Sequence, residues 1–156
     1  MRKVILFSTA FLLLFALRVT VSAQTMSDCE KERMTLESNK KMVAEFYQEL
    51  FGDKNIDAIN KYIGDVYIQH NPYVADGKRA LIDACKEWFK GAQKDTIDIQ
   101  HIGADGNLVF IHLRSHEGTR TVSVIDIFRI ENGKIVEHWD VGQAVPEKAA
   151  NGHPMF

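Results

Sequence analysis

The sequence predicts an α+β fold, with helices first and an antiparallel sheet after them. Before Gly91, apolar residues recur mostly at the spacing of amphipathic helices. After Gly91 the chain changes to runs of branched and aromatic residues with alternating exposure, which is typical of strands. Short glycine turns separate these runs, and Asn132-Gly133 is the strongest hairpin signal among them. Such an order predicts helices packed on one face of a mainly antiparallel sheet.

Three helices and one short strand are expected before Gly91. The helices span 36–51, 56–63 and 77–90, and Asn55 and Asp76 are the predicted N-caps of the second and third. The strand, 66–70, lies between the second and third helices and is closed by Asn71-Pro72. Four further strands are expected at 96–102, 108–116, 121–130 and 134–141.

The N-terminus has the pattern of a secretory signal peptide, assigned here to residues 1–23. A basic start precedes the apolar run 4–17, and Val21-Ser-Ala23 supplies small residues before a cut ahead of Gln24. The run is shorter than the ~20 residues that span a bilayer. We therefore expect a periplasmic or secreted protein without stable membrane insertion. A polar leader, 24–35, would then precede a single domain, 36–156.

Charge and cysteine content exclude several classes of protein. Cleavage removes Arg2, Lys3 and Arg18 but no acidic residue, leaving 16 basic and 21 acidic side chains and a formal charge of −5. Nucleic-acid binding needs a basic surface, so nucleic acid is not an expected partner. Neither a zinc-ligand spacing nor a glycine-rich phosphate loop occurs. Cys29 and Cys85 are compatible with a disulfide in an exported protein or with two unpaired thiols.

Asp126 is the most unusual residue of the predicted sheet. It lies between Val124 and Phe128 in a run without proline or glycine, where a carboxylate is expensive to bury. An apolar surrounding raises the pKa of a carboxyl group toward that of a useful general base. The alternative is a structural carboxylate satisfied by a backbone amide or an arginine.

The Asn132-Gly133 turn predicts which residues share a face with Asp126. A two-residue loop pairs Glu131 with Lys134, and counting outward places Asp126 opposite Trp139. Phe128 would share this face, while His138 and Asp140 would lie on the opposite face, at a sheet surface or a dimer contact. The position of His112 depends on the preceding turn. A two-residue loop at Glu117-Gly118 would place His112 on the face opposite to Asp126. A loop one residue longer would place both side chains on the same face.

Several segments resemble the SnoaL-like polyketide cyclases of the nuclear transport factor 2-like superfamily. The resemblance covers about residues 36–156 and includes its aldol-condensation subgroup. It rests on Tyr67-Ile-Gln-His-Asn-Pro72, Asp76-Gly77, Asp126-Ile-Phe-Arg129, Glu131-Asn-Gly-Lys-Ile-Val-Glu-His-Trp-Asp140 and the tail Asn151-Gly-His-Pro-Met-Phe156.

The resemblance implies a cone-shaped roll in which a strongly curved sheet encloses an apolar pocket. Family cyclases use an aspartate and a nearby histidine, without cofactor or metal, and these map onto Asp126 and His112. This mapping favours the longer turn at Glu117 to Thr119. Phe110 replaces a side chain that is often polar in the family, which removes a hydrogen-bond partner for a polyketide. The superfamily also implies a homodimer formed through the outer face of the sheet.

These arguments together predict an exported protein that binds a small apolar carbonyl compound. The expected activity is that of a cyclase, lyase or isomerase, with Asp126 as general acid/base and His112 beside it. Six residues are expected to contact the substrate: His70, Asn71, Trp88, Phe110, Phe128 and Trp139. A non-enzymatic binding module is the alternative. A hydrolase would need a second acid facing Asp126, for which Glu137 is the candidate.

Overall fold

A computed structural model describes the backbone of residues 6–156 and side-chain exposure for residues 27–156. The predicted basic start of the signal peptide, Met1 to Lys3, lies outside the described residues. The first element is helix α1 (Leu6–Tyr47). A compact unit spans Leu36 to Phe156 and so includes the last turns of α1. No helix of the described part is both long and apolar enough to cross a membrane.

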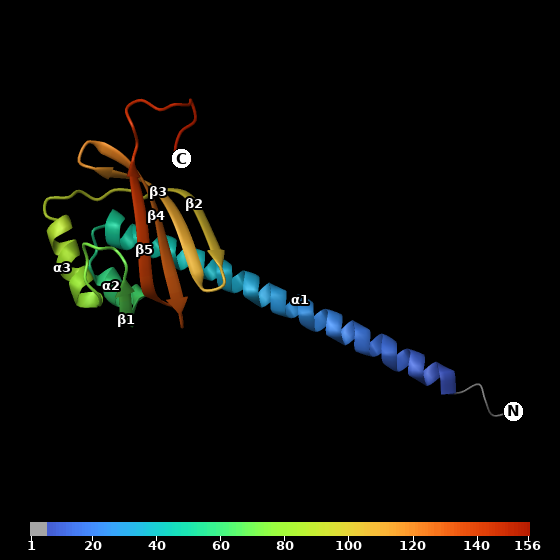
Figure 1. The fold of residues 1–156 in the computed structure, drawn as a ribbon. Helices are drawn as coiled ribbons and strands as arrows, with labels where there is room; N and C mark the ends of the chain where they lie inside the picture. The colour runs from blue at the N-terminus through green and yellow to red at the C-terminus, as the bar shows by residue number, and fades with distance from the viewer. Residues whose placement is uncertain (1–5) are drawn as a thin grey trace. The chain divides into compact units, whose positions relative to one another are not determined.

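The compact unit is built on one curved five-stranded sheet with the order β1-β5-β4-β3-β2 (Figure 1). Only β1 is parallel to its neighbour, because the chain between β1 and β5 passes through helix α3 and the other strands. The later strands join in antiparallel hairpins, as the sequence predicts, with ends moved by a few residues. The strands are β1 (Ile63–Gln69), β2 (Asp98–Asp105), β3 (Leu108–Glu117), β4 (Arg120–Glu131) and β5 (Lys134–Ala144).

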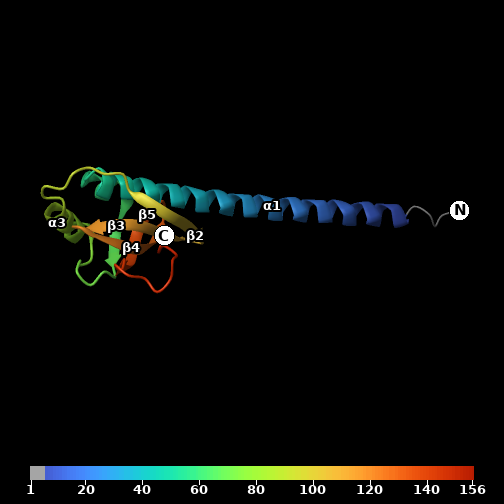
Figure 2. The same ribbon diagram turned by 90° about the horizontal axis from the view of Figure 1, so that it is seen from above.

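Three helical segments cover the inner face of this sheet together with the end of α1 (Figure 2). They are the π-helical turn η1 (Gln48–Gly52), α2 (Asp57–Tyr62) and α3 (Lys78–Trp88). Phe46 is at the centre of the core and contacts the rings of Tyr62 and Phe128 edge-on. Its ring is 2% exposed, so this aromatic cluster holds the end of α1 against β4.

Neither predicted cap is the N-cap residue of its helix, and the N-cap of α2 is Ile56, which makes no side-chain cap hydrogen bond. The side-chain oxygen of Asn55 accepts a hydrogen bond from the Asp57 N–H at 3.1 Å, at the start of α2. Asp76 does not cap α3, and that prediction is wrong. Its carboxylate instead accepts the backbone N–H of Gln69 at 2.7 Å and so ties the loop before α3 to the end of β1.

The pairing of β4 with β5 contains a bulge that reverses the predicted faces. Glu131 pairs with Lys134 as expected, but the register shifts by one residue at Arg129/Ile130. Asp126 consequently pairs with Asp140, and Trp139 pairs with Ile127 on the outer face. The predicted pairing of Asp126 with Trp139 is therefore wrong, and His138 and Asp140 do not lie at the sheet surface. A one-residue bulge exchanges every side chain beyond it between the two faces.

The turn between β3 and β4 also differs from the expectation. Glu117 pairs with Arg120, so Gly118 and Thr119 form a two-residue loop. His112 then pairs with Ile125, while Ile111 pairs with Asp126. The longer turn that the resemblance favoured is wrong, and His112 lies on the face opposite to Asp126.

Candidate active site

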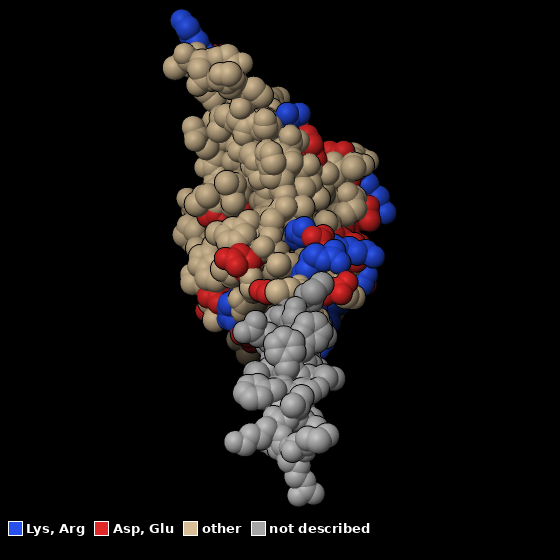
Figure 3. All heavy atoms as spheres, turned by 90° about the vertical axis from the view of Figure 1, so that its right-hand side faces the viewer, with Lys and Arg blue, Asp and Glu red and all other residues tan. Residues whose placement is uncertain are grey.

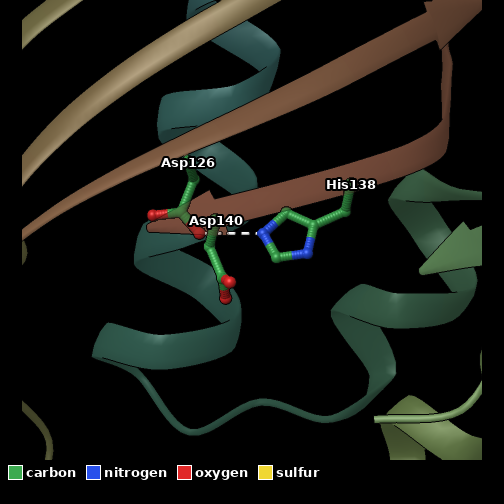
Figure 4. A group of neighbouring side chains, drawn as sticks. All are labelled: Asp126, His138 and Asp140. Atoms are coloured by element: carbon green, nitrogen blue, oxygen red, sulfur yellow. Dashed lines mark hydrogen bonds and ion pairs between the residues drawn. The ribbon is translucent and has the colours of Figure 1, made fainter. Parts of the chain in front are cut away.

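Asp126 projects from the centre of β4 onto the inner face and is 3% exposed. One carboxylate oxygen, Oδ2, accepts the hydroxyl hydrogen of Tyr47 at 2.8 Å, from the last residue of α1. The other, Oδ1, lies 2.8 Å from Nε2 of His138 on β5 (Figure 4). The carboxyl group thus has hydrogen-bond partners from two other elements, and these interactions offset the free-energy cost of its burial.

Gln69 holds the other side of the His138 ring. Its side-chain oxygen lies 2.7 Å from Nδ1 of His138 and accepts the Asn71 N–H at 3.0 Å, while its amide nitrogen donates to the Tyr67 hydroxyl. The Asn71 contact fixes the orientation of the amide, because a backbone N–H needs an acceptor, whereas a hydroxyl can take either role. A carbonyl oxygen only accepts, so Nδ1 of His138 must carry a hydrogen.

The tautomer of His138 determines what lies between it and Asp126. With Nδ1 protonated, a neutral ring would point the Nε2 lone pair at a carboxylate oxygen only 2.8 Å away. That contact is favourable only when a proton lies between the two atoms. Asp126 and His138 therefore share a proton, held either as a carboxylate with an imidazolium or as a carboxylic acid with a neutral imidazole.

Two tyrosines stay protonated around this pair. Burial raises the pKa of Tyr47 well above its ordinary value, and the nearby charge of Asp126 raises it further. Burial, followed by the charge of Asp126, also raises the pKa of Tyr67. Tyr67 receives a hydrogen bond from Gln69, and no acceptor among the described residues takes its hydroxyl hydrogen. Tyr67 can therefore donate to a ligand.

Asp140 adds a second carboxylate on the same face. It is half-buried, and its Oδ2 accepts the side-chain N–H of Asn71 at 2.6 Å. Ligand-type atoms of Asp126, His138 and Asp140 all lie within 4.8 Å of one another, so these three are the described residues best placed to hold a metal ion.

These polar groups line a cavity of about 180 Å³ whose other walls are mainly apolar. The apolar side chains come from the helices, from β4 and from the loop between β1 and α3: Phe46, Phe51, Val74, Leu81, Trp88, Val124 and Phe128. A more polar hollow of about 530 Å³ shares Tyr47, Phe51 and Val124 with this cavity. The arrangement suits a ligand that is mostly apolar and carries one polar group to the Asp126 end.

Four of the eight predicted site residues line the cavity. They are Asp126, Asn71, Trp88 and Phe128. The other four do not: His112, His70, Phe110 and Trp139. The shifted registers described above explain His112, Phe110 and Trp139, because each belongs to the outer-facing set of its strand.

The outer-facing residues have partners of their own. Nε2 of His112 lies 2.7 Å from the Ser123 hydroxyl, and Nδ1 lies 3.1 Å from Nδ1 of His101. His70 stacks on Trp139 at 4.6 Å and contacts Glu137. The His70 hydrogen bond, assisted by Arg129, lowers the pKa of Glu137. Glu137 therefore serves an outer-face ion pair and is not the second acid expected of a hydrolase.

Five residues of the site escaped the sequence analysis: Tyr47, Tyr67, Gln69, His138 and Asp140. Tyr47 was assigned only to an apolar helix face, and Tyr67 and Gln69 only to a motif. The alternation of His138 and Asp140 along β5 was visible in the sequence. The prediction did not include the bulge and therefore placed both residues on the wrong face.

Comparison with known proteins places this site in a family. A family model described as a SnoaL-like domain matches residues 43–138. The chain belongs to the SnoaL-like family. The matched part of the SnoaL-like domain includes Tyr47, Gln69, Asn71, Asp126 and His138, and Asp140 follows two residues later. The resemblance found in the sequence is thereby confirmed. No curated protein matches the chain.

Solved structures share the fold of this SnoaL-like protein. A nuclear transport factor 2-like protein of unknown function from Burkholderia xenovorans LB400 is 18% identical, with a TM-score of 0.60 over 73% of this chain and 89% of that chain. A protein from Jannaschia sp. CCS1, assigned as a SnoaL-like polyketide cyclase, is 16% identical, with a TM-score of 0.57 over 69% and 86%. An LEH-like epoxide hydrolase from M. tuberculosis is 20% identical, with a TM-score of 0.55 over 70% and 85%. At these identities the likeness establishes the α+β cone fold alone.

Proposed function

We propose that this SnoaL-like protein is a cofactor-independent enzyme that moves a proton next to a carbonyl group of a small apolar substrate. The observation that carries the proposal is the buried Asp126–His138 pair, whose carboxylate oxygen and Nε2 lie 2.8 Å apart in the wall of a largely apolar cavity. Aldol-type cyclisation, its reverse and isomerisation all begin with such a proton transfer. We also propose that the chain is exported after cleavage before Gln24, as the pattern of residues 1–23 predicts.

The residues have distinct parts in this mechanism. The Asp126 carboxylate takes a proton from the carbon beside the carbonyl group, while the Tyr47 hydroxyl keeps the carboxylate oriented. The Tyr67 hydroxyl donates to the carbonyl oxygen, on which negative charge develops. His138 is a positioning residue, because its ring is fixed by Gln69 and determines the charge that Asp126 carries. The apolar wall excludes water from the reacting atoms.

Deuterium uptake from heavy water tests the proposal without knowledge of the natural substrate. Cyclic ketones, β-diketones and β-hydroxyketones would be incubated with the protein, and loss of the α-hydrogen signal followed by NMR. We expect Asp126→Asn to lower the rate by about 10²–10⁴-fold and Tyr67→Phe by about 10²-fold. Asp105→Asn, an exposed aspartate at the end of β2, is the matched control and should leave the rate unchanged.

The outcomes separate enzyme from binding module. Probes that bind the wild-type protein but exchange no faster than in buffer would leave only the binding role. Exchange that persists in Asp126→Asn would remove Asp126 from the mechanism.

Hydrolysis is the second candidate, and the pairing of Asp126 with Asp140 favours it. Asp126 and Asp140 lie on one face of the sheet, and Asn71 donates a hydrogen bond to Asp140. Such a pair of carboxylates can orient and activate a water molecule. An epoxide hydrolase shares the fold. Small epoxides and ¹⁸O-labelled water would test this candidate. Diol formation lost in both Asp126→Asn and Asp140→Asn, with no deuterium uptake by ketones, would favour hydrolysis over proton transfer at carbon.

A further inference from the structure

Three ligand-type side chains converge at the cavity floor, and each is held by a residue outside the group. Figure 4 shows the Asp126 carboxylate and the His138 ring facing each other from β4 and β5, with the Asp140 carboxylate beside them and ligand atoms of all three within 4.8 Å of one another. Tyr47 donates to Asp126, the Gln69 oxygen accepts from Nδ1 of His138, and Asn71 donates to Asp140. Such outer hydrogen bonds are what metal-binding histidines and carboxylates need in order to present a defined ligand atom.

The hydrogen bond from His138 to Gln69 leaves Nε2 as the coordinating atom. Nε2 faces a carboxylate oxygen of Asp126 at 2.8 Å, and His138 and Asp126 are only 8% and 3% exposed. Two electron-rich atoms this close in a buried place require a proton or a cation between them. The shared proton takes this place in the metal-free protein, and a metal ion bonded to both atoms would take it instead.

We propose that the site formed by Asp126, His138 and Asp140 binds a divalent transition metal ion of the zinc type in place of the shared proton. One imidazole nitrogen and two carboxylate oxygens suit zinc and its neighbours, whereas magnesium and calcium prefer oxygen ligands alone. Three protein ligands leave a coordination position open, as in zinc sites that keep a water or a substrate. That position faces the cavity lined by the same residues.

Metal and proton compete for the same lone pairs. A bound ion occupies the oxygen and nitrogen atoms between which the proton would lie, so the ion inhibits proton transfer at carbon. This inhibition rests on the proposed function, but the binding itself does not.

Titration of the purified, chelator-treated full chain with Zn²⁺ and Co²⁺ tests the proposal. Calorimetry should show one ion per chain, and Co²⁺ should give the visible absorption of a low-symmetry site with nitrogen and oxygen ligands. We expect His138→Gln to weaken binding at least 100-fold and Asp140→Asn at least tenfold. Asp140 is half-buried, so the second variant remains informative if the first does not fold. Mg²⁺ should not bind at comparable concentrations.

His112→Gln is the matched control, because His112 and His101 form the other histidine cluster of the described chain. This control should bind Zn²⁺ like the wild type. Loss of binding in His112→Gln, with retention in His138→Gln, would move the site to the outer face and overturn the proposal. Absence of stoichiometric binding would overturn it too. Tyr67→Phe should bind Zn²⁺ normally while losing proton transfer, so failure of the proposed function and failure of the metal site can be told apart.

Discussion

Burial favours the protonated form of several side chains in the compact unit, among them those of Tyr47, Tyr67 and Cys85. Tyr47 and Tyr67 remain hydrogen-bond donors because burial opposes their ionisation. The same cause acts on Cys85, which lies on the buried face of α3 and whose pKa is raised to about 12. Cys29 lies on the exposed part of α1, and the two thiols are not joined in a disulfide.

The two cysteines should therefore differ sharply in reactivity. A thiol reagent attacks the thiolate, and at neutral pH the raised pKa leaves Cys85 in the protonated form. We expect one thiol to be labelled per folded chain and two after unfolding in urea. In Cys29→Ser the folded protein should remain unlabelled. Rapid labelling of folded Cys29→Ser would show that the core around Cys85 opens readily.

At the scale of whole elements, the bulge in β5 is the feature that the sequence concealed. The order of helices and strands followed from periodicity and turn residues, because these are local signals. Asp126 stood out because a carboxylate is costly within a strand. Which residues meet Asp126 depends on register, and no local signal in Ile135 or Val136 marks the extra residue. The prediction is therefore confirmed for the fold and wrong for the faces of Trp139, His138 and Asp140, while the catalytic role of Asp126 stays a prediction.

Val136, at the bulge, lies in close contact with Gly64 of β1. A Cβ atom added at Gly64 would lie 3.0 Å from Cγ1 of Val136 and 3.3 Å from the Val66 carbonyl oxygen. We expect Gly64→Ala to lower the free energy of unfolding by about 1–3 kcal/mol through overpacking. Because Val136→Ala removes that Cγ1 atom, the double variant should lose less stability than the sum of the single variants. Urea unfolding of the four proteins measures this coupling, and strict additivity would contradict it.

At the scale of the whole molecule, the compact unit from Leu36 to Phe156 contains all of the core and the candidate site. Acidic and basic side chains are interspersed on the face shown in Figure 3, where no extended basic surface is seen. The outer face of the sheet, in contrast, exposes the apolar side chains of Phe110, Ile125 and Val141. Such a surface is typical of an interaction site.

Removal of residues 1–35 should leave a folded protein. The core residues all lie after Thr35, so the truncated chain should unfold at the same urea concentration as the full chain, within about 0.5 M. Circular dichroism follows the transition. A broad or absent transition would show that the unit needs the preceding part of α1.

The homodimer that the resemblance implied remains a prediction, and the outer face is where we expect it. Light scattering should give twice the mass of the chain. Ile125→Asp should give a monomer, because it places a charge within the apolar surface. Tyr73→Asp, at a 91% exposed position away from the sheet, is the matched control. A monomeric wild-type protein would contradict the prediction.

The bulge has a consequence for how this hairpin can vary among relatives. His138 and Asp140 reach the cavity only because of the number of residues between them and the Asn132-Gly133 turn. A single insertion or deletion between Glu137 and Asp140 would turn His138, Asp140 or both toward the outer face. The site would then be lost even though the sequence still contained all of its residues. Natural variation in this segment should therefore exchange side chains freely while keeping its length constant.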